Sequence, residues 1–334
     1  VSIAPAITLA PQVVAVVVTY QPHQETLLAL LRALAPQVAR VVVVDNAAVG
    51  SEVFGWKLAE RFHHLELLQL GSNQGIAAAQ NRGMARAIEW GASHVLLSDQ
   101  DSVAEPTLVA QLLHGLAVCA QAPGAATVAA IGPATVDVRT GRVSSFIPAG
   151  RTRSSSRIEG HNTSTLPLME VGFLIASGTL IPVEVIAKMG GVRSEYFIDH
   201  VDTEWCFRVR AAGYRLMGVT LPLLHHRLGD HVQKVWLLRE RHVARHAPLR
   251  DYYMARNTLA LLKTTSLSLG WRAHFVWRVL QYVGFYILLS GDKLAHLKML
   301  ALGLSHGLHG THGKLNPQTL ETEAVPRSAL DPQP

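Results

Sequence analysis

The first hundred residues of this 334-residue chain predict an α/β fold with a mainly parallel sheet flanked by helices. Short β-branched runs alternate with segments of helical spacing, and the runs are apolar at nearly every position rather than at every second one. Strands of this kind are buried on both faces, as in a parallel sheet whose crossover connections are helices. The hydrophobic content of 49% is sufficient for a large core.

Seven elements follow one another in this part of the chain. The predicted strands cover residues 12–20, 40–46, 65–70 and 93–99, and the predicted helices cover 24–35, 52–62 and 75–90. Ligands of parallel sheets lie beyond the carboxyl ends of the strands. Thr19, Asp45, Asn73 and Asp99 all fall at or just past these ends, so we expect a binding site along this edge.

The rest of the chain changes character twice. Residues 127–147 predict short strands joined by the turn RTGR, 151–165 a polar, serine-rich loop, 171–182 a buried strand or turn, and 201–214 a helix ended by Gly213. From Pro248 the pattern is largely helical. The apolar stretch 273–290 is interrupted by Arg278 and Gln281, which disfavours a membrane span. We expect this helix to lie on a membrane surface or to pack against the rest of the chain.

Charge and cysteine content limit the partners and the cell compartment that the sequence is compatible with. The net charge is +6, and the segment from Lys234 to Lys298 holds 11 Lys or Arg against 3 Asp or Glu. This excess predicts an anionic partner for that segment: a membrane surface, a nucleic acid or a phosphorylated ligand. The two cysteines, Cys119 and Cys206, form no CxxC pair, which supports neither a disulfide framework nor a zinc site and is typical of a reducing cytosol. The first residues do not resemble a secretory signal.

The run HVLLSDQDSV, residues 94–103, ends in two aspartates one residue apart. Carboxylates are rarely buried unless they are paired or bind a cation. Because Mg²⁺ takes one or two carboxylates together with phosphates, Asp99 and Asp101 are suited to a cation that carries a diphosphate. The alternative is that Asp101 or Ser102 caps a helix beginning near Pro106.

The predicted helix 75–90 begins with SNQGIAAAQNRG. Small residues at a helix start let the backbone approach a ligand, and the amides there suit an anion. Close packing of an alanine-rich helix on the sheet is the alternative. No GxGxxG follows the first strand and no GxxxxGK[ST] occurs, so neither a Rossmann dinucleotide site nor a P-loop is indicated.

Five segments together resemble, in order, the inverting glycosyltransferase family 2, which has a GT-A fold: VVTY, VVDN, GSNQGIAAAQNRG, SDQDS and FIDHVDTEWCFRVRAAGY. SDQDS, FIDHVDTEWC and HAPLRDYYMARN further resemble the bacterial dTDP-rhamnose-dependent rhamnosyltransferases, particularly those adding the second rhamnose to rhamnolipids. The resemblance implies inverting transfer of L-rhamnose from dTDP-L-rhamnose to a hydroxyl of a lipid-linked acceptor. That acceptor would be mono-rhamnolipid or an O-antigen or polysaccharide intermediate, and Mg²⁺ or Mn²⁺ would assist.

The resemblance also implies roles for residues that bind the nucleotide sugar. Thr19 and Tyr20 would lie near the nucleoside, Asp45 would bond the pyrimidine base, and Asn73 with Gly75 would line the nucleotide pocket. Gln80 stands where many members of the family have an arginine. This departure leaves the phosphate contacts to Arg82 or to later basic residues.

Four further roles concern the sugar, the metal and the diphosphate. Asp99 would face the ribose or the donor sugar, and Asp101 would hold the metal. His226 would reach the diphosphate or the metal, with a structural histidine as the alternative. Arg256 would pair with the diphosphate, unless it is an arginine on a helix surface.

Asp202 matches the general base of the family. Val201 precedes it where glutamate is widespread, so Asp199 and Glu204 remain candidates. An acceptor hydroxyl is a very weak acid and needs a positioned carboxylate, which should come from a different segment than the metal ligand. The alternative interpretation of DTEW is a helix start with an acidic first turn.

The predicted organisation is a GT-A domain at 10–245, a helical extension at 246–312 where we expect the membrane contact, and a disordered tail at 313–334. The enzyme would be cytoplasmic and peripheral on the inner face of the cytoplasmic membrane. Rival hypotheses are a family 2 enzyme using another nucleotide sugar, a nucleotidyltransferase, and a non-catalytic basic protein that binds nucleic acid or membrane. Nucleic acid is disfavoured as a partner, because such a protein would carry repeated aromatic residues among Lys and Arg on a sheet or in a groove, whereas the basic residues here lie on predicted apolar helices.

Overall fold

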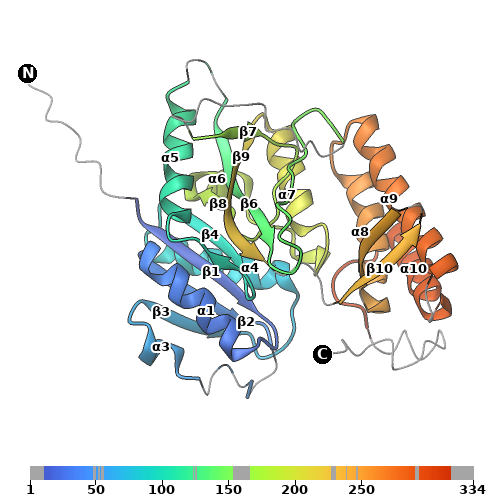
Figure 1. The fold of residues 1–334 in the computed structure, drawn as a ribbon, viewed down its shortest axis with the longest axis horizontal. Helices are drawn as coiled ribbons and strands as arrows, with labels where there is room; N and C mark the ends of the chain where they lie inside the picture. The colour runs from blue at the N-terminus through green and yellow to red at the C-terminus, as the bar shows by residue number, and fades with distance from the viewer. Residues whose placement is uncertain are drawn as a thin grey trace, which may run out of the picture.

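A computed structural model of the chain describes residues 11–47, 50, 51, 53, 56–122, 124, 126–152, 166–226, 231–237, 239–245, 247–289 and 293–316. Within them, a nine-stranded sheet has the order β3-β2-β1-β4-β8-β6-β9-β5, with β7 paired to β9 (Figure 1). Strands β3, β2, β1 and β4 are parallel, while β8 is antiparallel to both β4 and β6. The predicted α/β fold is therefore confirmed, with a parallel first half and a mixed second half.

The first half of the sheet follows the predicted element order. It contains β1 (Val13–Thr19), α1 (Gln24–Leu34), the 3-10 turn η1 (Ala35–Gln37), β2 (Arg40–Asp45), α3 (Leu58–Arg61), β3 (Leu65–Gln69), α4 (Ile76–Glu89) and β4 (His94–Asp99). The predicted helix 52–62 is interrupted: Val53 is helical, but Trp56 and Lys57 are not. Lys57 has a left-handed backbone with φ of 51°, so α3 can begin only after it. Residues 52, 54 and 55 lie outside the described part of the chain.

The second half contains more irregular connections. Its elements are β5 (Val103–Ala104), α5 (Leu108–Ala120), β6 (Val128–Asp137), β7 (Leu168–Glu170), β8 (Leu180–Pro182), α6 (Val183–Met189), the 3-10 turn η2 (Ser194–Tyr196), α7 (Val201–Ala211) and β9 (Arg215–His226). The predicted turn at RTGR forms, since Gly141 N donates to Asp137 O at 2.8 Å. The strand expected after it is reduced to one bridge between Val136 and Val143. Most of the predicted polar loop, residues 153–165, lies outside the described residues.

Helices cover both faces of the sheet. One apolar cluster joins alternate residues of β1, β2 and β4 to α4, α6 and α7, and a second joins the other alternate residues to α1, α3 and α5. Strands buried on both faces explain the uninterrupted apolar runs in the sequence. On α4, Gly83 packs so closely on β1 that a Cβ there would collide with Val16. The small residues of α4 therefore bring this helix close to the sheet.

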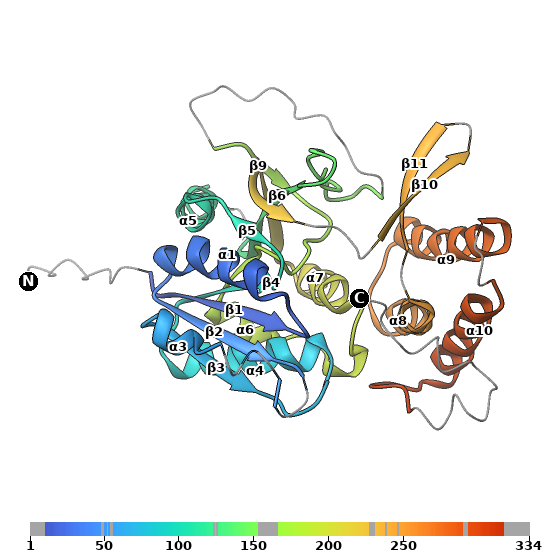
Figure 2. The same ribbon diagram turned by 60° about the horizontal axis from the view of Figure 1, so that its bottom comes forward.

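The C-terminal elements lie on one side of the sheet, as both ribbon views show (Figures 1 and 2). They are the hairpin β10 (His231–Leu237) and β11 (Arg239–Arg245), then α8 (Pro248–Thr264), α9 (Leu269–Leu289) and α10 (Lys293–His309). The hairpin was not predicted from the sequence. Helices α8 and α10 pack on each other through a buried polar pair, in which Asp251 Oδ2 and His296 Nδ1 are 2.5 Å apart.

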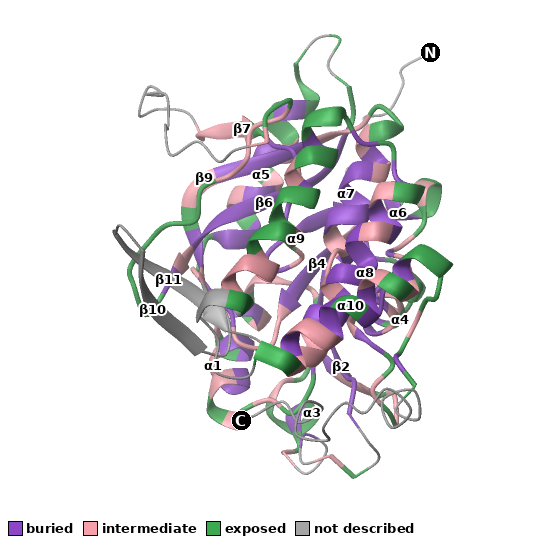
Figure 3. Cartoon of the chain, turned by 90° about the vertical axis from the view of Figure 1, so that its right-hand side faces the viewer, coloured by how far each residue is buried: buried purple, intermediate pink, exposed green. Residues whose placement is uncertain are grey.

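Helix α9, which includes most of the apolar stretch 273–290, has two different faces. Trp271 and Phe275 are buried against Phe207 of α7. Trp277 and Leu280 are 59% and 55% exposed, and Figure 3 shows this outer face among the exposed segments. No helix within the described residues is long and apolar enough to cross a membrane.

The start of the predicted disordered tail is ordered. Leu315 is buried beside Phe197, Tyr252 and Tyr253, and its amide donates to Tyr253 Oη at 2.9 Å. The prediction was wrong for residues 313–316, because the sequence does not show that Leu315 has an apolar site to fill. Residues 317–334 lie outside the described part of the chain.

Candidate functional site

The register of the parallel strands aligns the predicted site residues at one edge. Thr19 is paired with Asp45 across β1 and β2, and Val18 is paired with Asp99 across β1 and β4. Three neighbouring strands therefore end in a hydroxyl and two carboxylates at one edge of the sheet, with Thr19 and Asp45 on one face and Asp99 aligned with the other. This is the edge at which parallel sheets bind ligands.

Asp45 is held by hydroxyl groups. Thr19 Oγ1 donates to Asp45 Oδ1 at 3.4 Å, and Ser51 Oγ donates to Asp45 Oδ2. Asp45 and Thr19 are both almost fully buried. Hydrogen bonds to both carboxylate oxygens fix the side chain in one orientation.

Two asparagines extend this edge towards α4. Asn46 Nδ2 donates to Asn73 Oδ1 at 3.1 Å, and Asn73 Oδ1 also accepts from Gly75 N at 3.0 Å. The amide of Gln74 donates to Asn46 Oδ1 at 2.8 Å. Sequence reasoning missed Asn46, although it follows Asp45 directly in the segment VVDN.

Gly75 has a packing function. Its φ is +89°, and a Cβ at this position would lie within 2.5 Å of the Phe197 ring. Ala77 N also donates to Phe197 O at 3.4 Å. Three amides at the start of α4, those of Gln74, Gly75 and Ala77, thus have protein acceptors. The alternative of close packing is supported by these contacts, while an anion site at the helix start stays a prediction.

Tyr20 is tied to the Asp-Gln-Asp turn. Its amide donates to Gln100 Oε1 at 2.7 Å, and Gln100 Nε2 donates back to Tyr20 O at 3.3 Å. The Tyr20 side chain is 39% exposed. Gln100, which sequence reasoning did not select, therefore fixes the loop after β1 against the turn between Asp99 and Asp101.

The Asp-x-Asp turn does not cap a helix. Helix α5 begins at Leu108, with Thr107 at its N-cap position and no side-chain cap. Ser102 instead bonds Ser177, with the two Oγ atoms 2.8 Å apart, and the Asp99 amide donates to Ser177 Oγ at 3.4 Å. The capping alternative was wrong. Asp99 and Asp101 are both partly exposed at the sheet edge.

The residues of this turn fit a divalent cation by their donor chemistry. The described residues contain no group of three His, Cys, Asp or Glu side chains arranged to hold a metal. Mg²⁺, however, takes oxygen ligands and uses one or two carboxylates, completing its shell with phosphates and water. Asp99 and Asp101 supply such oxygens where a diphosphate ligand would complete the shell.

The end of β9 lies beside this turn. Val103 of β5 is paired with His225 of β9 in antiparallel register, so position 226 lies opposite position 102. His225 Nε2 is 2.5 Å from Glu105 Oε1, which gives this ring a partner within the protein. The His226 side chain lies outside the described residues. Its expected role as a ligand stays a prediction.

Asp202 lies in the first turn of α7, where backbone amides hold its carboxylate. Thr203 N donates to Oδ1 at 2.7 Å, and Ala176 N donates to Oδ2 at 3.2 Å. His200, not Asp202, occupies the N-cap position. A small part of Asp202 reaches the surface, but protein surrounds the rest, and this burial raises the pKa of its carboxyl group.

One loop joins the candidate base to the candidate metal ligands. Ala176 bonds Asp202, while the next residue, Ser177, bonds Asp99 and Ser102. Consecutive residues of one loop therefore fix the distance between two acidic groups that are about a hundred positions apart in sequence. The structure thus links Asp202 to the Asp-x-Asp turn.

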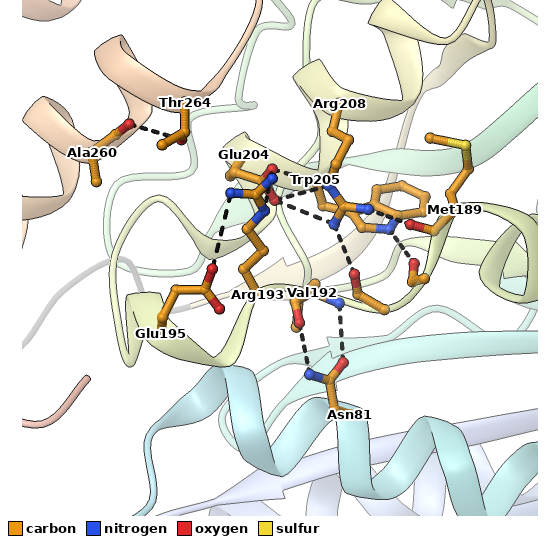
Figure 4. A network of polar contacts seen from close by, with 12 residues as sticks. Asn81, Met189, Val192, Arg193, Glu195, Glu204, Trp205, Arg208, Ala260 and Thr264 are labelled. Atoms are coloured by element: carbon orange, nitrogen blue, oxygen red, sulfur yellow. Dashed lines mark hydrogen bonds and ion pairs between the residues drawn. The ribbon is translucent and has the colours of Figure 1, made fainter. Parts of the chain in front are cut away.

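Glu204 is a structural residue. It is 1% exposed and lies between two guanidinium groups, with Oε1 3.1 Å from Arg193 Nε and 3.0 Å from Arg208 Nε. Figure 4 shows this cluster, in which Arg208 also donates to the carbonyls of Met189 and Gly191. A carboxylate buried between two arginines has no access to an acceptor. The alternative assignment of Glu204 as the base is therefore corrected.

Asp199 has an unusual environment. Its φ is +61°, its Oδ1 accepts from Arg250 Nε at 3.2 Å, and its Oδ2 is buried with no hydrogen-bond partner among the described residues. Phe197 and His200 also have positive φ. Non-glycine residues adopt this conformation only when surrounding contacts impose it.

Arg256 and Asn257 of α8 supply those contacts. Asn257 Nδ2 donates to the carbonyls of Tyr196, Ile198 and Asp199 at 2.8, 2.6 and 3.0 Å. Arg256, 1% exposed, donates to the carbonyls of Tyr196, Glu195 and Gly313. The helix-surface alternative for Arg256 was wrong. Its guanidinium donates to backbone carbonyls within the protein. The structure therefore does not place it where the expected contact with a diphosphate would need it.

A cavity of about 640 Å³ lies away from this edge. Ser93 and His94, at the amino end of β4, line it together with Glu184. Parallel sheets bind ligands at the opposite ends of their strands. We therefore assign the site to the edge that carries Asp45, Asp99 and Asp202.

Comparisons with known proteins agree with this geometry. The sequence profile of the family described as glycosyltransferase like family 2 matches residues 2–244. The dTDP-rhamnosyl transferase RfbF of Shigella flexneri is 31% identical over 300 residues, which cover 90% of this chain and 96% of the relative.

Solved structures share the fold at low sequence identity. TarS 1-349 of S. aureus in complex with UDP-GlcNAc has a TM-score of 0.54 and 14% identity, over 93% of this chain and 83% of that chain. GalNAc-T7 with UDP, GalNAc and Mn²⁺ has a TM-score of 0.53 and 10% identity, over 83% and 57% of the two chains. These likenesses show the fold alone. The sheet, its acidic edge, the matched profile and the 31% identical relative lead to one conclusion: the chain belongs to glycosyltransferase family 2 and is a GT-A-type glycosyltransferase.

Proposed function

We propose that this enzyme transfers L-rhamnose from dTDP-L-rhamnose to a hydroxyl of a lipid-linked acceptor, with inversion at the anomeric carbon. The observation that carries the proposal is the loop at Ala176 and Ser177, which holds the candidate base Asp202 beside the Asp-x-Asp turn. The choice of donor is supported by the dTDP-rhamnosyl transferase relative, of which the chain covers 96%. Mono-rhamnolipid and an O-antigen or polysaccharide intermediate are the two acceptor classes.

The nucleotide would lie along the ends of β1 and β2. Asp45, fixed by two hydroxyl groups, is suited to accept the N–H of a pyrimidine base. Thr19, Tyr20 and Asn73 would border the nucleoside, and Gly75 would support this border through its packing on Phe197. Asp99 would face the ribose or the sugar.

Asp202 would remove the proton of the attacking hydroxyl. A base works best when its pKa approaches the working pH, and burial moves the pKa of Asp202 upward in that direction. The amides of Ala176 and Thr203 fix the direction of its oxygens. Asp101, with His226 as a second candidate, would hold a Mg²⁺ or Mn²⁺ ion, which when bound offsets the charge of the departing dTDP.

A transfer assay tests this function. The full chain is incubated with dTDP-L-rhamnose, a divalent cation and either mono-rhamnolipid or a lipid-linked glycan, and products are identified by mass spectrometry. A product heavier by one rhamnosyl group, with the opposite anomeric configuration to the donor, supports the proposal. Transfer from a UDP-sugar but not from dTDP-rhamnose would support the rival family 2 enzyme. Thermal stabilisation by an oligonucleotide, without stabilisation by dTDP, would support a nucleic-acid-binding protein.

The membrane-facing surface would be the outer face of α9. Exposed Trp277 and Leu280 lie on the same helix as exposed Arg278. Trp277 and Leu280, three positions apart, share one exposed face, and Arg278 flanks it. An apolar face flanked by basic residues is typical of helices that lie on anionic lipid, where each basic residue near the surface contributes about 1 kcal/mol. This arrangement would place the enzyme on the inner face of the cytoplasmic membrane, where a lipid-linked acceptor is found.

A further inference from the structure

The segment after α10 returns to the sheet, at the edge where the parallel strands end. Thr311 N donates to His306 O at 2.9 Å, and the chain then turns from the helices towards the sheet (Figure 2). We call residues 311–316 the return segment. Its end lies against elements more than a hundred residues earlier in the chain.

Two residues of the return segment are fixed on either side of Lys314. Gly313 N donates to Glu195 O at 2.8 Å, and Gly313 O accepts from Arg256 Nη1. Leu315 is buried and its amide donates to Tyr253 Oη. The backbone at Lys314 is therefore held in place from both sides, although its side chain is exposed.

The ammonium of Lys314 reaches the loop between β3 and α4. Its Nζ donates to Asn73 O at 3.2 Å. Asn73 is the residue whose side chain bonds Asn46 and Gly75 at the end of the parallel strands. A lysine ammonium has three N–H donors, and the other two have no partner among the described residues.

A positive charge beside Asn73 would offset the negative charge of the nearby carboxylates. The described side chains that form the edge are carboxylates, hydroxyls and amides, and the amides of Gln74, Gly75 and Ala77 already have protein acceptors. A nucleoside diphosphate is an anion, and Asp45, Asp99 and Asp202 would repel it. A cation at the border of the pocket reduces this repulsion and can donate to a phosphate oxygen.

We propose that Lys314 is a donor-binding residue: the return segment places its positive charge beside Asn73, at the border of the bound nucleotide, from where it attracts the anionic diphosphate. The inference rests on the proposed function, because it assumes a nucleoside diphosphate sugar as the donor. If so, the return segment, which follows the C-terminal helices, contributes a charged group to the donor site.

The test uses the full chain and isothermal titration with dTDP and with uncharged thymidine. Lys314→Met should raise the Kd of dTDP about tenfold, the loss of one charge-assisted hydrogen bond, and leave the Kd of thymidine within twofold. Lys314→Arg should keep most of the affinity. Lys188→Met, which removes an exposed lysine of α6, is the matched control and should bind dTDP as the parent does. An unchanged melting temperature of Lys314→Met checks that its fold is intact.

The outcomes separate this inference from the function on which it rests. If the parent protein binds dTDP but Lys314→Met binds it equally well, Lys314 has no role in donor binding and the inference is wrong. Equal weakening of dTDP and thymidine would also overturn it, since a contact with the diphosphate cannot act on thymidine. If the parent protein binds none of dTDP, UDP and GDP, the proposed function itself fails, and the inference fails with it.

Discussion

The proposed nucleotide side and the proposed acceptor side of the site are built in different ways. On the nucleotide side, Thr19, Asp45 and Asp99 lie at the ends of parallel strands, whose register places them. On the acceptor side, Asp202 follows a segment in which Phe197, Asp199 and His200 have left-handed backbones. Side chains from α8, some sixty residues later, hold this segment. The first arrangement depends on local pattern and register, whereas the second depends on long-range contacts.

Replacing the candidate base should have the largest effect on the acceptor side. Asp202→Asn should lower kcat by about 100-fold or more, the range expected for loss of a general base, while the Kd of dTDP changes little. Stopped assays of sugar transfer and titration of dTDP measure the two quantities. Asp199→Asn is the control. If it loses turnover and Asp202→Asn does not, the base has been assigned to the wrong aspartate.

The pH profile gives a second test of Asp202. Because burial raises its pKa, the carboxylate gains a proton at a higher pH than an ordinary aspartate, whose pKa is about 4. A base must be deprotonated, so kcat should fall as the pH drops through this raised pKa. The acid limb should be absent from the residual activity of Asp202→Asn.

On the nucleotide side, the largest expected effect is at Asp101. Asp101→Asn removes one charge from the Asp-x-Asp turn and should abolish most of the transfer, and dTDP binding should no longer depend on Mn²⁺. Titration of dTDP with and without Mn²⁺ measures this dependence. Glu184→Gln, in the first turn of α6 beside the amino end of β4, removes an exposed charge away from the site and serves as control. Retention of most activity by Asp101→Asn would show that the metal assignment is wrong.

A smaller effect is expected where α8 holds the acceptor side. Asn257→Leu leaves three carbonyls without their side-chain donor, and each buried unsatisfied group costs roughly 1–3 kcal/mol. We expect a loss of about 3 kcal/mol in the free energy of unfolding and about a tenfold fall in kcat, with the Kd of dTDP nearly unchanged. Urea unfolding and kinetics measure these values. Equal losses in kcat and in dTDP affinity would mean that the two sides are not independent.

Glu204→Gln should affect stability without affecting chemistry. The substitution leaves Arg193 and Arg208 without their shared carboxylate and should lower the free energy of unfolding by about 2 kcal/mol, less than for a fully buried pair because both arginines are partly exposed. The kcat at a temperature well below the unfolding transition should remain within about twofold. A large loss of kcat in a stable variant would restore Glu204 as a candidate base.

The smallest effect on catalysis is expected at α9. Trp277→Ser combined with Leu280→Ser should reduce co-sedimentation with vesicles containing phosphatidylglycerol and leave transfer to a soluble acceptor unchanged. Binding by the parent protein should weaken as salt rises. Ile88→Ser with Val118→Ser removes two other exposed apolar side chains and is the control. Parent protein that does not bind vesicles would leave the outer face of α9 without a membrane function.

The difference between the two sides also explains what could be predicted from the sequence. The apolar runs predicted the parallel strands. The positions of Asp45 and Asp99 at the strand ends predicted the edge that we assign to the nucleotide. Asp202 was found through the resemblance to a family. The roles of Arg256 and Asn257 were missed, because a basic and an amide side chain on a predicted helix carry no sign of which backbone carbonyls they will meet.

The same limit applies to the mixed half of the sheet and to the return segment. The antiparallel insertion of β8 between β4 and β6 depends on pairings between distant strands that no local pattern encodes. Leu315 is one apolar residue in a polar stretch, and only the folded structure shows the aromatic cluster that buries it.

The contacts of Arg256 have a consequence for synthesis of the protein. A nascent chain that has left the ribosome as far as residue 245 contains all the strands of the large sheet, and domains fold as units during synthesis. The donors that hold residues 195–199 emerge only with α8, and the carbonyl of Gly313 emerges later still. The nucleotide edge can therefore form well before the loop beside Asp202 is held in place. Until the return segment is made, Arg256 lacks one of the carbonyls that it bonds in the folded protein, and the segment it holds is not fully fixed.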